Sequence, residues 1–397
     1  MIVLVVNCGS SSMKYQLIDM SDEHVMVSGV AERITFDHGV ITHKLNGEKI
    51  VIEKDMATHK DAVDLLMEFL VDPKYHIINS MSDIDAVGHR VLHGGSKYSA
   101  SVVVDDAVLK AIEECIPLGP LHNPANLMGI NACAAALPGV PQVAVFDTAF
   151  HQTMPAYAST YPIPYEYVEK HKIRKYGFHG TSHRYVSLKA AEMMGTNEFK
   201  LVTCHLGNGA SCAAVLNGKC VDTSMGLTPL DGLEMGTRCG TVDPAVVKFL
   251  CDKEGLTVDE VDDILNKKSG VLGVSGVSND FRDVEEAMNN GNERARLAMD
   301  IFYYRVRTTI GQYAAAMDGV DAIVFTAGVG ENSASARTAI CKGLTYLGVK
   351  IDEELNSKRG EAMFINTPDS KVKVMVIPTN EELMIALDTV ELTKDLK

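Results

Sequence analysis

The sequence predicts an α/β protein built from two similar domains, and three observations carry this prediction. The chain has 397 residues, which is more than one ordinary hydrophobic core accommodates. Strand-like runs alternate with helical patterns in both halves. Two glycine-centred hairpins of one design also lie about two hundred residues apart, at Ile2–Ile18 and Leu201–Val215.

Each of these hairpins joins an apolar, β-prone run to a second such run through a tight turn of small residues. The turns read Asn7-Cys8-Gly9-Ser10-Ser11-Ser12 and His205-Leu206-Gly207-Asn208-Gly209. A turn of this kind directs backbone N–H groups, hydroxyls or a lysine at one point, where a phosphate can bind. One copy is weak evidence because most Gly/Ser turns are only turns. Two copies in equivalent settings indicate a duplicated domain with a nucleotide between the halves.

Composition limits the class of protein and its compartment. The chain is 46% hydrophobic and 22% charged, which is typical of a folded, soluble protein, and its formal charge of −15 argues against nucleic-acid binding. No run is long enough to span a bilayer, so no membrane is expected, and Ile2–Val6 lacks the features of a signal peptide. The nine cysteines are scattered without a C-x-x-C pair. We therefore expect a protein of the reducing cytoplasm without structural zinc.

The first half reads as mixed strands and helices. A second hairpin, residues 41–52, turns at Asn46-Gly47, a type I′ signal. Helical patterns follow at residues 58–70, 106–115 and 124–137, and Gln142–Asp147 reads as a buried strand ending in a carboxylate. We place the first domain at residues 1–149, completed by a C-terminal helix at about 383–397.

The second half, residues 150–382, repeats this order after an irregular, proline-containing stretch at Thr153–Tyr167. The predicted elements are a helix at 182–194, the second glycine hairpin, helices at 242–252, 257–266 and 293–317, the strand Ala322–Thr326 followed by a helix, a last strand at 372–377, and a helix starting at Asn380-Glu381-Glu382. No low-complexity linker separates the halves.

A third phosphate-binding candidate is Gly328-Val329-Gly330-Glu331-Asn332, which lies between a predicted strand and a predicted helix. It partly matches a dinucleotide fingerprint, but Ser333 occupies the place of the third glycine, so we discount a Rossmann domain. A Walker A motif is absent, because Lys219 is followed by Cys220. The segment is either a glycine turn that lets a ligand approach the backbone or an ordinary βα turn.

Arginines and histidines flanked by glycine form a second signal. They occur in Gly88–Gly95 around Arg90, in Gly177–His183, and in Gly236–Gly240 around Arg238. An arginine fork binds two oxygens of a carboxylate or phosphate, and neighbouring glycines let the anion come near. Each segment alone is more often a structural ion pair, but three together favour an anion site.

Two carboxylates at the ends of predicted elements form a third signal. Asp147 closes an apolar strand, and Glu381 opens a helix. An acidic residue at a helix start is usually only favourable with the helix dipole. Beside a polyphosphate, the same residue can hold Mg²⁺, which binds through one or two carboxylates, waters and phosphate oxygens.

Together these motifs resemble the acetate kinase family. The matching segments are Asn7-Cys8-Gly9-Ser10-Ser11-Ser12-x-Lys14, Gly88-His89-Arg90, Tyr176–His183, His205–Gly209, Asp280-Phe281-Arg282, Gly328–Asn332 and Pro378-Thr379-Asn380-Glu381-Glu382. The resemblance extends from Val3 to the C-terminal helix. It implies two duplicated actin-like (ribonuclease H-like) ATPase domains with a nucleotide cleft between them, and a homodimer.

The resemblance also implies a role for individual residues. Asn7 and Glu381 match positions associated with Mg²⁺, which Mn²⁺ can replace. The residues that match the nucleotide and phosphate contacts are Ser10, Ser12, Lys14, His205, Leu206, Gly207, Asn208, Gly209, Asp280, Phe281, Arg282, Gly328, Val329, Gly330, Glu331 and Asn332. The residues that match the catalytic group are Arg90, Asp147, His179 and Arg238.

The implied acyl site comprises Arg90, Leu92, Leu121, His122, Phe178 and Pro229. The family more often has valine where Leu92 stands, which leaves the acid itself open. The expected reaction is reversible in-line phosphoryl transfer from ATP to acetate, giving ADP and acetyl phosphate. A kinase for propionate or another short acid is the alternative on the same fold. An actin-like or chaperone-like ATPase is the rival from another class, and it would not need a small acyl pocket.

Overall fold

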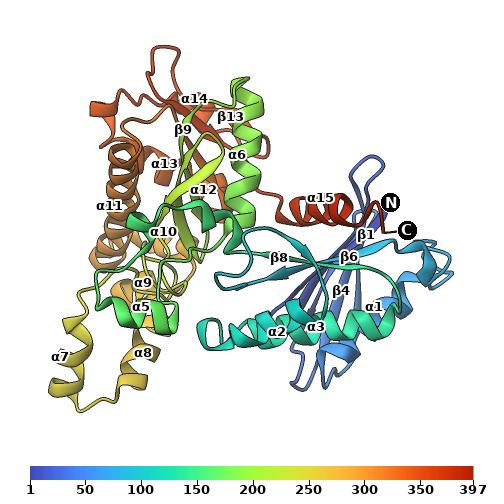
Figure 1. The fold of residues 1–397 in the computed structure, drawn as a ribbon. Helices are drawn as coiled ribbons and strands as arrows, with labels where there is room; N and C mark the ends of the chain where they lie inside the picture. The colour runs from blue at the N-terminus through green and yellow to red at the C-terminus, as the bar shows by residue number, and fades with distance from the viewer. Residues whose placement is uncertain (397) are drawn as a thin grey trace. The chain divides into compact units, whose positions relative to one another are not determined.

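The computed structural model describes residues 1–396, which form two compact units (Figure 1). Unit 1 contains Met1–Ala149 and the segment that starts at Asn380, and unit 2 is Phe150–Thr379. The sequence placed residues up to 382 in the second domain, whereas unit 2 ends at Thr379. Glu381 therefore belongs to unit 1.

Unit 1 is built on an eight-stranded sheet in the order β5-β4-β3-β2-β1-β6-β8-β7. Its strands are β1 (Ile2–Cys8), β2 (Ser12–Asp19), β3 (His24–Glu32), β4 (Val40–Leu45), β5 (Glu48–Glu53), β6 (Ala86–Val91), β7 (Val102–Val103) and β8 (Gln142–Phe146). Strands β1, β6 and β8 run parallel. The carboxyl ends of parallel strands meet at one sheet edge, so Asn7, Arg90 and Asp147 come together there although they are far apart in the chain.

Helices cover both faces of this sheet, with α1 and α3 on one side and α15 on the other (Figure 1). The helices of unit 1 are α1 (His59–Leu70), η1 (Met81–Asp83), α2 (Asp106–Glu114), η2 (Ile116–Leu118), α3 (Asn123–Ala136) and α15 (Glu381–Thr393), and η3 (Ala149–Thr153) crosses the unit boundary.

Strand β1 is buried on both faces because its side chains alternate between the two helical layers. Leu4 and Val6 join the core beneath α1 and α3, whereas Val3 and Val5 pack with Ile385 of α15. Burial of each such side chain stabilises the fold by roughly 1.5–3 kcal/mol. A continuous apolar run in β1 is therefore the pattern that a central parallel strand requires.

Unit 2 repeats this arrangement in a six-stranded sheet, ordered β11-β10-β9-β12-β14-β13. Its strands are β9 (Lys200–Leu206), β10 (Ala210–Leu216), β11 (Lys219–Thr223), β12 (Ala322–Thr326), β13 (Met363–Phe364) and β14 (Lys373–Val376). This order matches β3-β2-β1-β6-β8-β7 strand for strand, including the antiparallel hairpin and the two parallel neighbours. The predicted duplication is confirmed, and β4 and β5 are an extension of unit 1.

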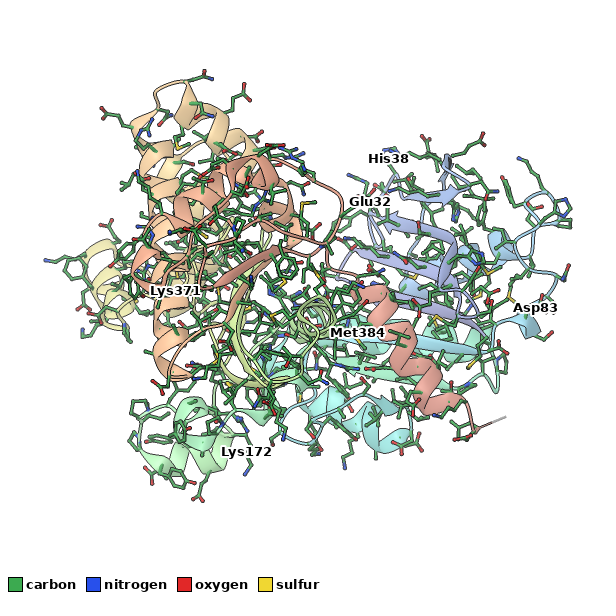
Figure 2. All side chains as sticks on the ribbon, turned by 90° about the horizontal axis from the view of Figure 1, so that it is seen from above. Glu32, His38, Asp83, Lys172, Lys371 and Met384 are labelled. Carbon is green, nitrogen blue, oxygen red and sulfur yellow. The ribbon has the colours of Figure 1, made fainter. Side chains whose placement is uncertain are left out.

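Helix α6 covers one face of the second sheet and α11 the other (Figure 1). The helices of unit 2 are α4 (Ala156–Ser159), α5 (Tyr165–His171), α6 (Gly180–Met194), α7 (Ala245–Glu254), α8 (Val258–Lys267), α9 (Gly270–Ser275), α10 (Phe281–Asn289), α11 (Glu293–Ala316), α12 (Ala327–Asn332), α13 (Ala334–Cys341), η4 (Thr345–Leu347) and α14 (Glu353–Asn356). Side chains fill the interior of each unit (Figure 2). None of the helices in residues 1–396 combines the length and apolarity that crossing a bilayer requires.

One predicted element has a different form in the structure. Residues 328–332, expected as a glycine turn, lie in the short helix α12, which follows β12 directly. Ala327 makes the sharp reversal with a φ of 63°, a left-handed conformation that a residue with a Cβ adopts only at some cost. Gly330 packs closely against β9 and β12, whereas Gly328 has open space around it that a ligand can approach.

Candidate active site

Unit 1 contains a cavity of about 200 Å³ at the carboxyl ends of β1 and β6. Its lining residues are Asn7, Cys8, Gly9, Ser12, Lys14, Arg90, Leu92, His122 and Asn126. Six of these nine were singled out in the sequence, and Cys8, Gly9 and Asn126 were not. Ser10 is exposed and outside the lining. A small cavity with one arginine, one lysine and an apolar wall suits a small carboxylate.

Arg90 is held in place by Asp147. Its Nε donates to Oδ1 of Asp147 at 3.0 Å and its Nη2 donates to Oδ2 at 2.6 Å. Asp147 is fully buried, whereas the Arg90 side chain is 25% exposed. The charge of Asp147 is the main cause that raises the pKa of Arg90. Both carboxylate oxygens are thus engaged by the arginine, which leaves Nη1 of Arg90 to bind an anion.

Glu381 is a partly buried carboxyl group at the first position of α15. Burial raises the pKa of Glu381 to about 7; the charges of Asp147 and Glu382 add to this, and Arg90 opposes it. The negative charge of Glu381, Asp147 and Glu382 therefore exceeds the positive charge of Arg90 and Lys14. A divalent cation would offset this excess, and the Glu381 carboxylate and the Asn7 amide oxygen are ligand types that Mg²⁺ accepts. The residues present fit a magnesium ion.

Asn126, which the sequence did not indicate, connects the ends of two strands beneath the cavity. Its Oδ1 accepts from the Leu92 N–H at 3.0 Å, and its Nδ2 donates to the Cys8 carbonyl at 2.9 Å. Leu92 is only 6% exposed and forms part of the cavity wall. Leu121, by contrast, is 64% exposed and does not line this cavity. Within unit 1, the acyl wall thus rests on Leu92 and His122.

In unit 2, the turn of the second glycine hairpin lies against Arg238 and His179. A Cβ on Gly209 would come within 2.7 Å of Nη2 of Arg238 and 3.5 Å of Nε2 of His179. The turn is closed by the Gly207 N–H, which donates to the Gly209 carbonyl at 3.1 Å. Glycine at position 209 therefore lets the backbone approach the Arg238 guanidinium and the His179 ring, and an anion can reach all three groups.

Arg238 is partly buried and has no acidic partner among the described residues. Its Nη1 donates to the Pro229 carbonyl at 2.7 Å, and within residues 1–396 no carboxylate forms an ion pair with it. Burial lowers the pKa of the Arg238 guanidinium. A desolvated guanidinium without a counter-ion gains strongly from binding an anion. Pro229 contributes its carbonyl here.

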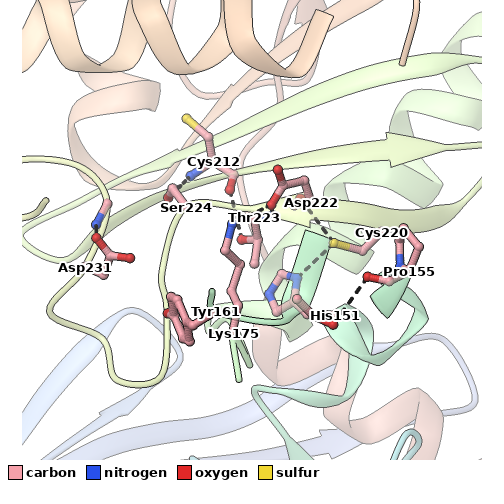
Figure 3. Close-up of polar contacts among 12 residues, drawn as sticks. His151, Pro155, Tyr161, Lys175, Cys212, Cys220, Asp222, Thr223, Ser224 and Asp231 are labelled. Atoms are coloured by element: carbon pink, nitrogen blue, oxygen red, sulfur yellow. Dashed lines mark hydrogen bonds and ion pairs between the residues drawn. The ribbon is translucent and has the colours of Figure 1, made fainter. Parts of the chain in front are cut away.

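His179 is the N-cap of α6, in a left-handed conformation with a φ of 56°. Its Nδ1 lies 2.8 Å from Oγ of Ser211, and its ring stacks on His205 with centroids 4.2 Å apart. Phe178 is almost fully buried, and its carbonyl accepts from Nε2 of His151 at 2.8 Å. His151 also contacts Cys220, as Figure 3 shows. The backbone and the ring of His179 are thus both fixed.

Unit 2 contains a cavity of about 730 Å³, large enough for a nucleotide. Its lining residues are Gly207, Asn208, Asn279, Asp280, Phe281, Arg282, Glu285, Met299, Gly328, Val329, Asn332, Ser333 and Arg359. Eight of them were assigned to the nucleotide from the sequence. Asn279, Glu285, Met299, Ser333 and Arg359 were not, because no motif marks them.

Five residues of unit 2 that the sequence assigned to the nucleotide lie outside this lining, namely His205, Leu206, Gly209, Gly330 and Glu331. Leu206 is fully buried at the end of β9, and the ring of His205 stacks on His179. The Cα of Gly330 packs against the backbone of β9 and β12. The Glu331 carboxylate accepts from the N–H groups of Ala327 at 2.8 Å and Thr379 at 3.1 Å, so it holds the start of α12.

Arg337 holds the C-terminal end of α12 through hydrogen bonds to its carbonyl groups. It is fully buried, and its Nη1 donates to the carbonyls of Gly330 and Glu331 at 2.8 and 3.0 Å. Its other donors reach Oδ1 and the carbonyl of Asn356. These bonds satisfy carbonyls at the end of α12 that a short helix leaves unpaired. The nucleotide-cavity wall formed by Gly328, Val329 and Asn332 is therefore rigid.

The duplicated sheets, each carrying a glycine hairpin and arginine at its functional edge, define an ATPase of the actin-like class. The chain belongs to the acetokinase family, whose sequence profile matches residues 2–387. It is 61% identical to an acetate kinase of Caldanaerobacter subterraneus over the full length of both chains. Among solved structures, it is similar to an acetate kinase of Porphyromonas gingivalis, with 51% identity, full coverage of both chains and a TM-score of 0.95. A propionate kinase of Francisella tularensis is 46% identical, covering 98% of this chain and 99% of its own, with a TM-score of 0.93.

Proposed function

We propose that this chain catalyses reversible phosphoryl transfer from ATP to acetate, with acetate bound in the cavity of unit 1. The observation that carries the assignment is the Arg90 fork, which is oriented by buried Asp147 beside the apolar wall of Leu92. Such a site pairs one anionic group with one short apolar group. The volume of about 200 Å³ suits a small acid better than a peptide.

The nucleotide binds in the large cavity of unit 2. Its backbone-rich wall at Gly207, Asn208 and Gly328 suits phosphates, and Phe281 offers an apolar contact to a base. The pair Asp280–Arg282 closes one side, with Nη2 to Oδ2 at 2.6 Å. These placements support the assignment of ATP and ADP to this unit.

In the reaction, an acetate oxygen attacks the γ-phosphorus in line while the bond to the β,γ-bridging oxygen breaks, so that ADP leaves. Acetate needs no general base, because its acidity is near that of a glutamate side chain, with a pKa of about 4.3. We assign Arg90 to the acetate carboxylate, and Arg238 and His179 to the oxygens of the transferred phosphoryl group. Asn7 and Glu381 would hold Mg²⁺, which would neutralise charge on the nucleotide phosphates.

Propionate is the second candidate acid, because a propionate kinase is similar to this chain over nearly its whole length. Leu92 decides between the acids if it limits the depth of the cavity. A conformational ATPase is set aside, because the match to the acetokinase family covers residues 2–387.

The direct test is acyl phosphate formation, trapped as the hydroxamate, from Mg-ATP with acetate, propionate or butyrate. We expect acetate-dependent ADP release, abolished by chelation of the metal and restored by Mg²⁺ or Mn²⁺. Calorimetric titration of Mg²⁺ into the wild-type and Glu381→Gln proteins gives a readout independent of turnover, and the variant should bind more weakly. ADP release that does not depend on added acid would refute the proposal.

A homodimer in the cytoplasm completes the proposal. Tyr304 and Leu297 are 59% and 54% exposed, one heptad apart on α11, and Phe249 and Val258 are similarly exposed on α7 and α8. Large exposed apolar side chains on these helices favour association with a second copy. All nine cysteines are free thiols, which supports a reducing compartment. Sedimentation equilibrium should give twice the mass of the chain, and a monomer would exclude the dimer.

A further inference from the structure

A chain of hydrogen bonds runs from the core of unit 2 to His179. Thr203 on β9 contacts Nδ1 of His183 at 2.7 Å, and Nε2 of His183 contacts Oγ of Ser211 at 2.8 Å. Ser211 in turn contacts Nδ1 of His179 at 2.8 Å. Thr203, His183 and Ser211 are all fully buried. The Ser211 hydroxyl therefore lies between the rings of His183 and His179, and it has a single proton to donate.

The direction of this chain follows from its inner end. The Thr203 hydroxyl donates to the Ala213 carbonyl at 3.4 Å, and a carbonyl can only accept. Thr203 then accepts from Nδ1–H of His183. Burial lowers the pKa of His183 far below its ordinary range, so this ring is neutral and carries one proton. Nε2 of His183 is consequently an acceptor, and the Ser211 hydroxyl donates to it.

The direction of the last hydrogen bond, between Ser211 and His179, then follows. Ser211 has used its proton on His183, so its oxygen accepts from Nδ1–H of His179. We propose that Ser211 and His183 are positioning residues that fix the proton of His179 on Nδ1 and direct Nε2 toward Gly209 and Arg238. The geometry supports this direction, because Nε2 lies 3.5 Å from the place of a Cβ on Gly209.

This tautomer of His179 has a consequence for catalysis, which rests on the proposed function. With Nδ1 already protonated, Nε2 carries a proton only when the ring is an imidazolium. A hydrogen bond from Nε2 to the transferred phosphoryl group therefore brings a full positive charge with it. Together with Arg238, this charge matches the negative charge on the phosphoryl oxygens in the transition state.

Nitrogen-15 NMR of histidine-labelled protein tests the tautomer without any assay of turnover. The His179 resonances are assigned by their loss in the His179→Gln variant. In the neutral ring, we expect the chemical shift of a protonated Nδ1 and an unprotonated Nε2. The opposite pattern in the wild-type protein would overturn the inference, because it requires Thr203 to donate to His183 and the whole chain to reverse.

Variants test whether Ser211 acts through His179. Ser211→Ala should give a mixture of both tautomers and lower kcat by about 10- to 100-fold, as loss of an outer partner does at metal-bound histidines. The KM values for acetate and ATP should change far less. Ser211→Thr keeps the hydroxyl and should restore the tautomer and most of kcat. Unchanged kcat and an unchanged tautomer in Ser211→Ala would also overturn the inference.

Thr223→Val is the matched control. Thr223 is a buried hydroxyl on the neighbouring strand that donates to the Cys212 carbonyl at 2.9 Å, and it takes no part in the hydrogen-bond chain through His183 and His179. Its removal should leave the His179 spectrum as it is. The wild-type spectrum also separates the two proposals. A protein that fails to phosphorylate acetate can still show protonated Nδ1, and an active enzyme with protonated Nε2 refutes the tautomer alone.

Discussion

Arg90 and Asp147 form a two-point ion pair, with Nε–Oδ1 and Nη2–Oδ2 distances of 3.0 and 2.6 Å, whereas Arg238 has only the Pro229 carbonyl. The two arginines are thus prepared differently for an anion. Arg90 is oriented before a substrate arrives, because its buried partner fixes the plane of the guanidinium. Arg238 is desolvated and uncompensated, so binding of an anion stabilises it most.

Asp147→Asn should remove the charge that orients Arg90 while keeping the volume of the side chain. The variant leaves the partly buried Arg90 without its partner. Breaking a buried ion pair in this way lowers the free energy of unfolding by about 3–5 kcal/mol. We expect kcat/KM for acetate to fall by about 10²-fold, measured by steady-state kinetics, together with a lower melting temperature. Asp222→Asn, which breaks the Lys175–Asp222 pair in unit 2, is the control and should leave kcat/KM for acetate near that of the wild type.

Arg238→Ala should lower kcat by a factor on the order of 10³, because loss of an arginine that stabilises a phosphoryl transition state has effects of about 10³–10⁵. The KM for acetate should change little. Arg238→Lys keeps the charge but loses the fork, so it should recover only part of the loss. A kcat close to that of the wild type in Arg238→Ala would show that this arginine is structural.

Gly209→Ala should inactivate the enzyme through Arg238, since the added methyl group would lie 2.7 Å from Nη2. The fold should be retained, because the displaced neighbour is the far end of a flexible side chain. A double-mutant cycle with Arg238→Ala measures the coupling. If Gly209 acts through Arg238, the second substitution adds little to the first. Fully additive losses would argue that the methyl group blocks the phosphate instead.

Leu92→Ala should raise kcat/KM for propionate and butyrate relative to acetate, because it deepens the acyl end of the cavity. One methylene in such a pocket is worth roughly 1–3 kcal/mol, or about 10- to 200-fold in kcat/KM. Leu121→Ala is the control, since Leu121 is 64% exposed and should leave the ratio unchanged. If Leu92 is only a core residue, its variant loses about 2–5 kcal/mol of stability without a change in preference.

The stability of the metal-free protein should fall as the pH rises toward 7, and Glu381 is the reason. Burial raises the pKa of Glu381 from 4.5 to about 7, so the folded state binds more protons than the unfolded chain between these values. The stability that protonated Glu381 contributes to the fold is fully present below pH 4.5 and is lost by about pH 7. In thermal melts, Glu381→Gln should flatten this dependence, and Mg²⁺ should stabilise the wild type above pH 7. Glu391→Gln, on the exposed face of α15, should do neither.

Much of the fold could be predicted because its periodic and turn signals are local. The two glycine hairpins and the strand Ala322–Thr326 appear close to their predicted places, and α11 covers almost the whole of its predicted range. Strand β6 was missed because Gly88, His89 and Arg90 do not look like a strand. Its place between β1 and β8 comes from tertiary packing, and Gly88 allows the close approach of Ile385 and Thr389 on α15.

The residues of the candidate site also differ in whether a local sequence signal marks them. Arg90, Lys14 and Gly209 carry local signals, since glycine, lysine and arginine beside a turn indicate an anion site. Asn126, Arg337 and Ser211 carry none, because each acts on a residue distant in sequence through one or two hydrogen bonds. Glu331 was assigned to the nucleotide from its motif, yet its carboxylate binds backbone N–H groups of Ala327 and Thr379. A motif fixes the position of a segment but not which of its side chains faces the ligand.

The return of α15 to unit 1 affects the synthesis of the protein. Strands β1, β6 and β8 leave the ribosome first, but the helix that covers their second face is translated after all of unit 2. Until then, Val3, Val5 and Val145 lack their apolar partners Ile385 and Ala386. Unit 2 is continuous in the chain and can fold during translation, whereas unit 1 is completed late. The nascent chain is therefore exposed to aggregation in its N-terminal part, and Glu381, the proposed metal ligand, is added at this last step.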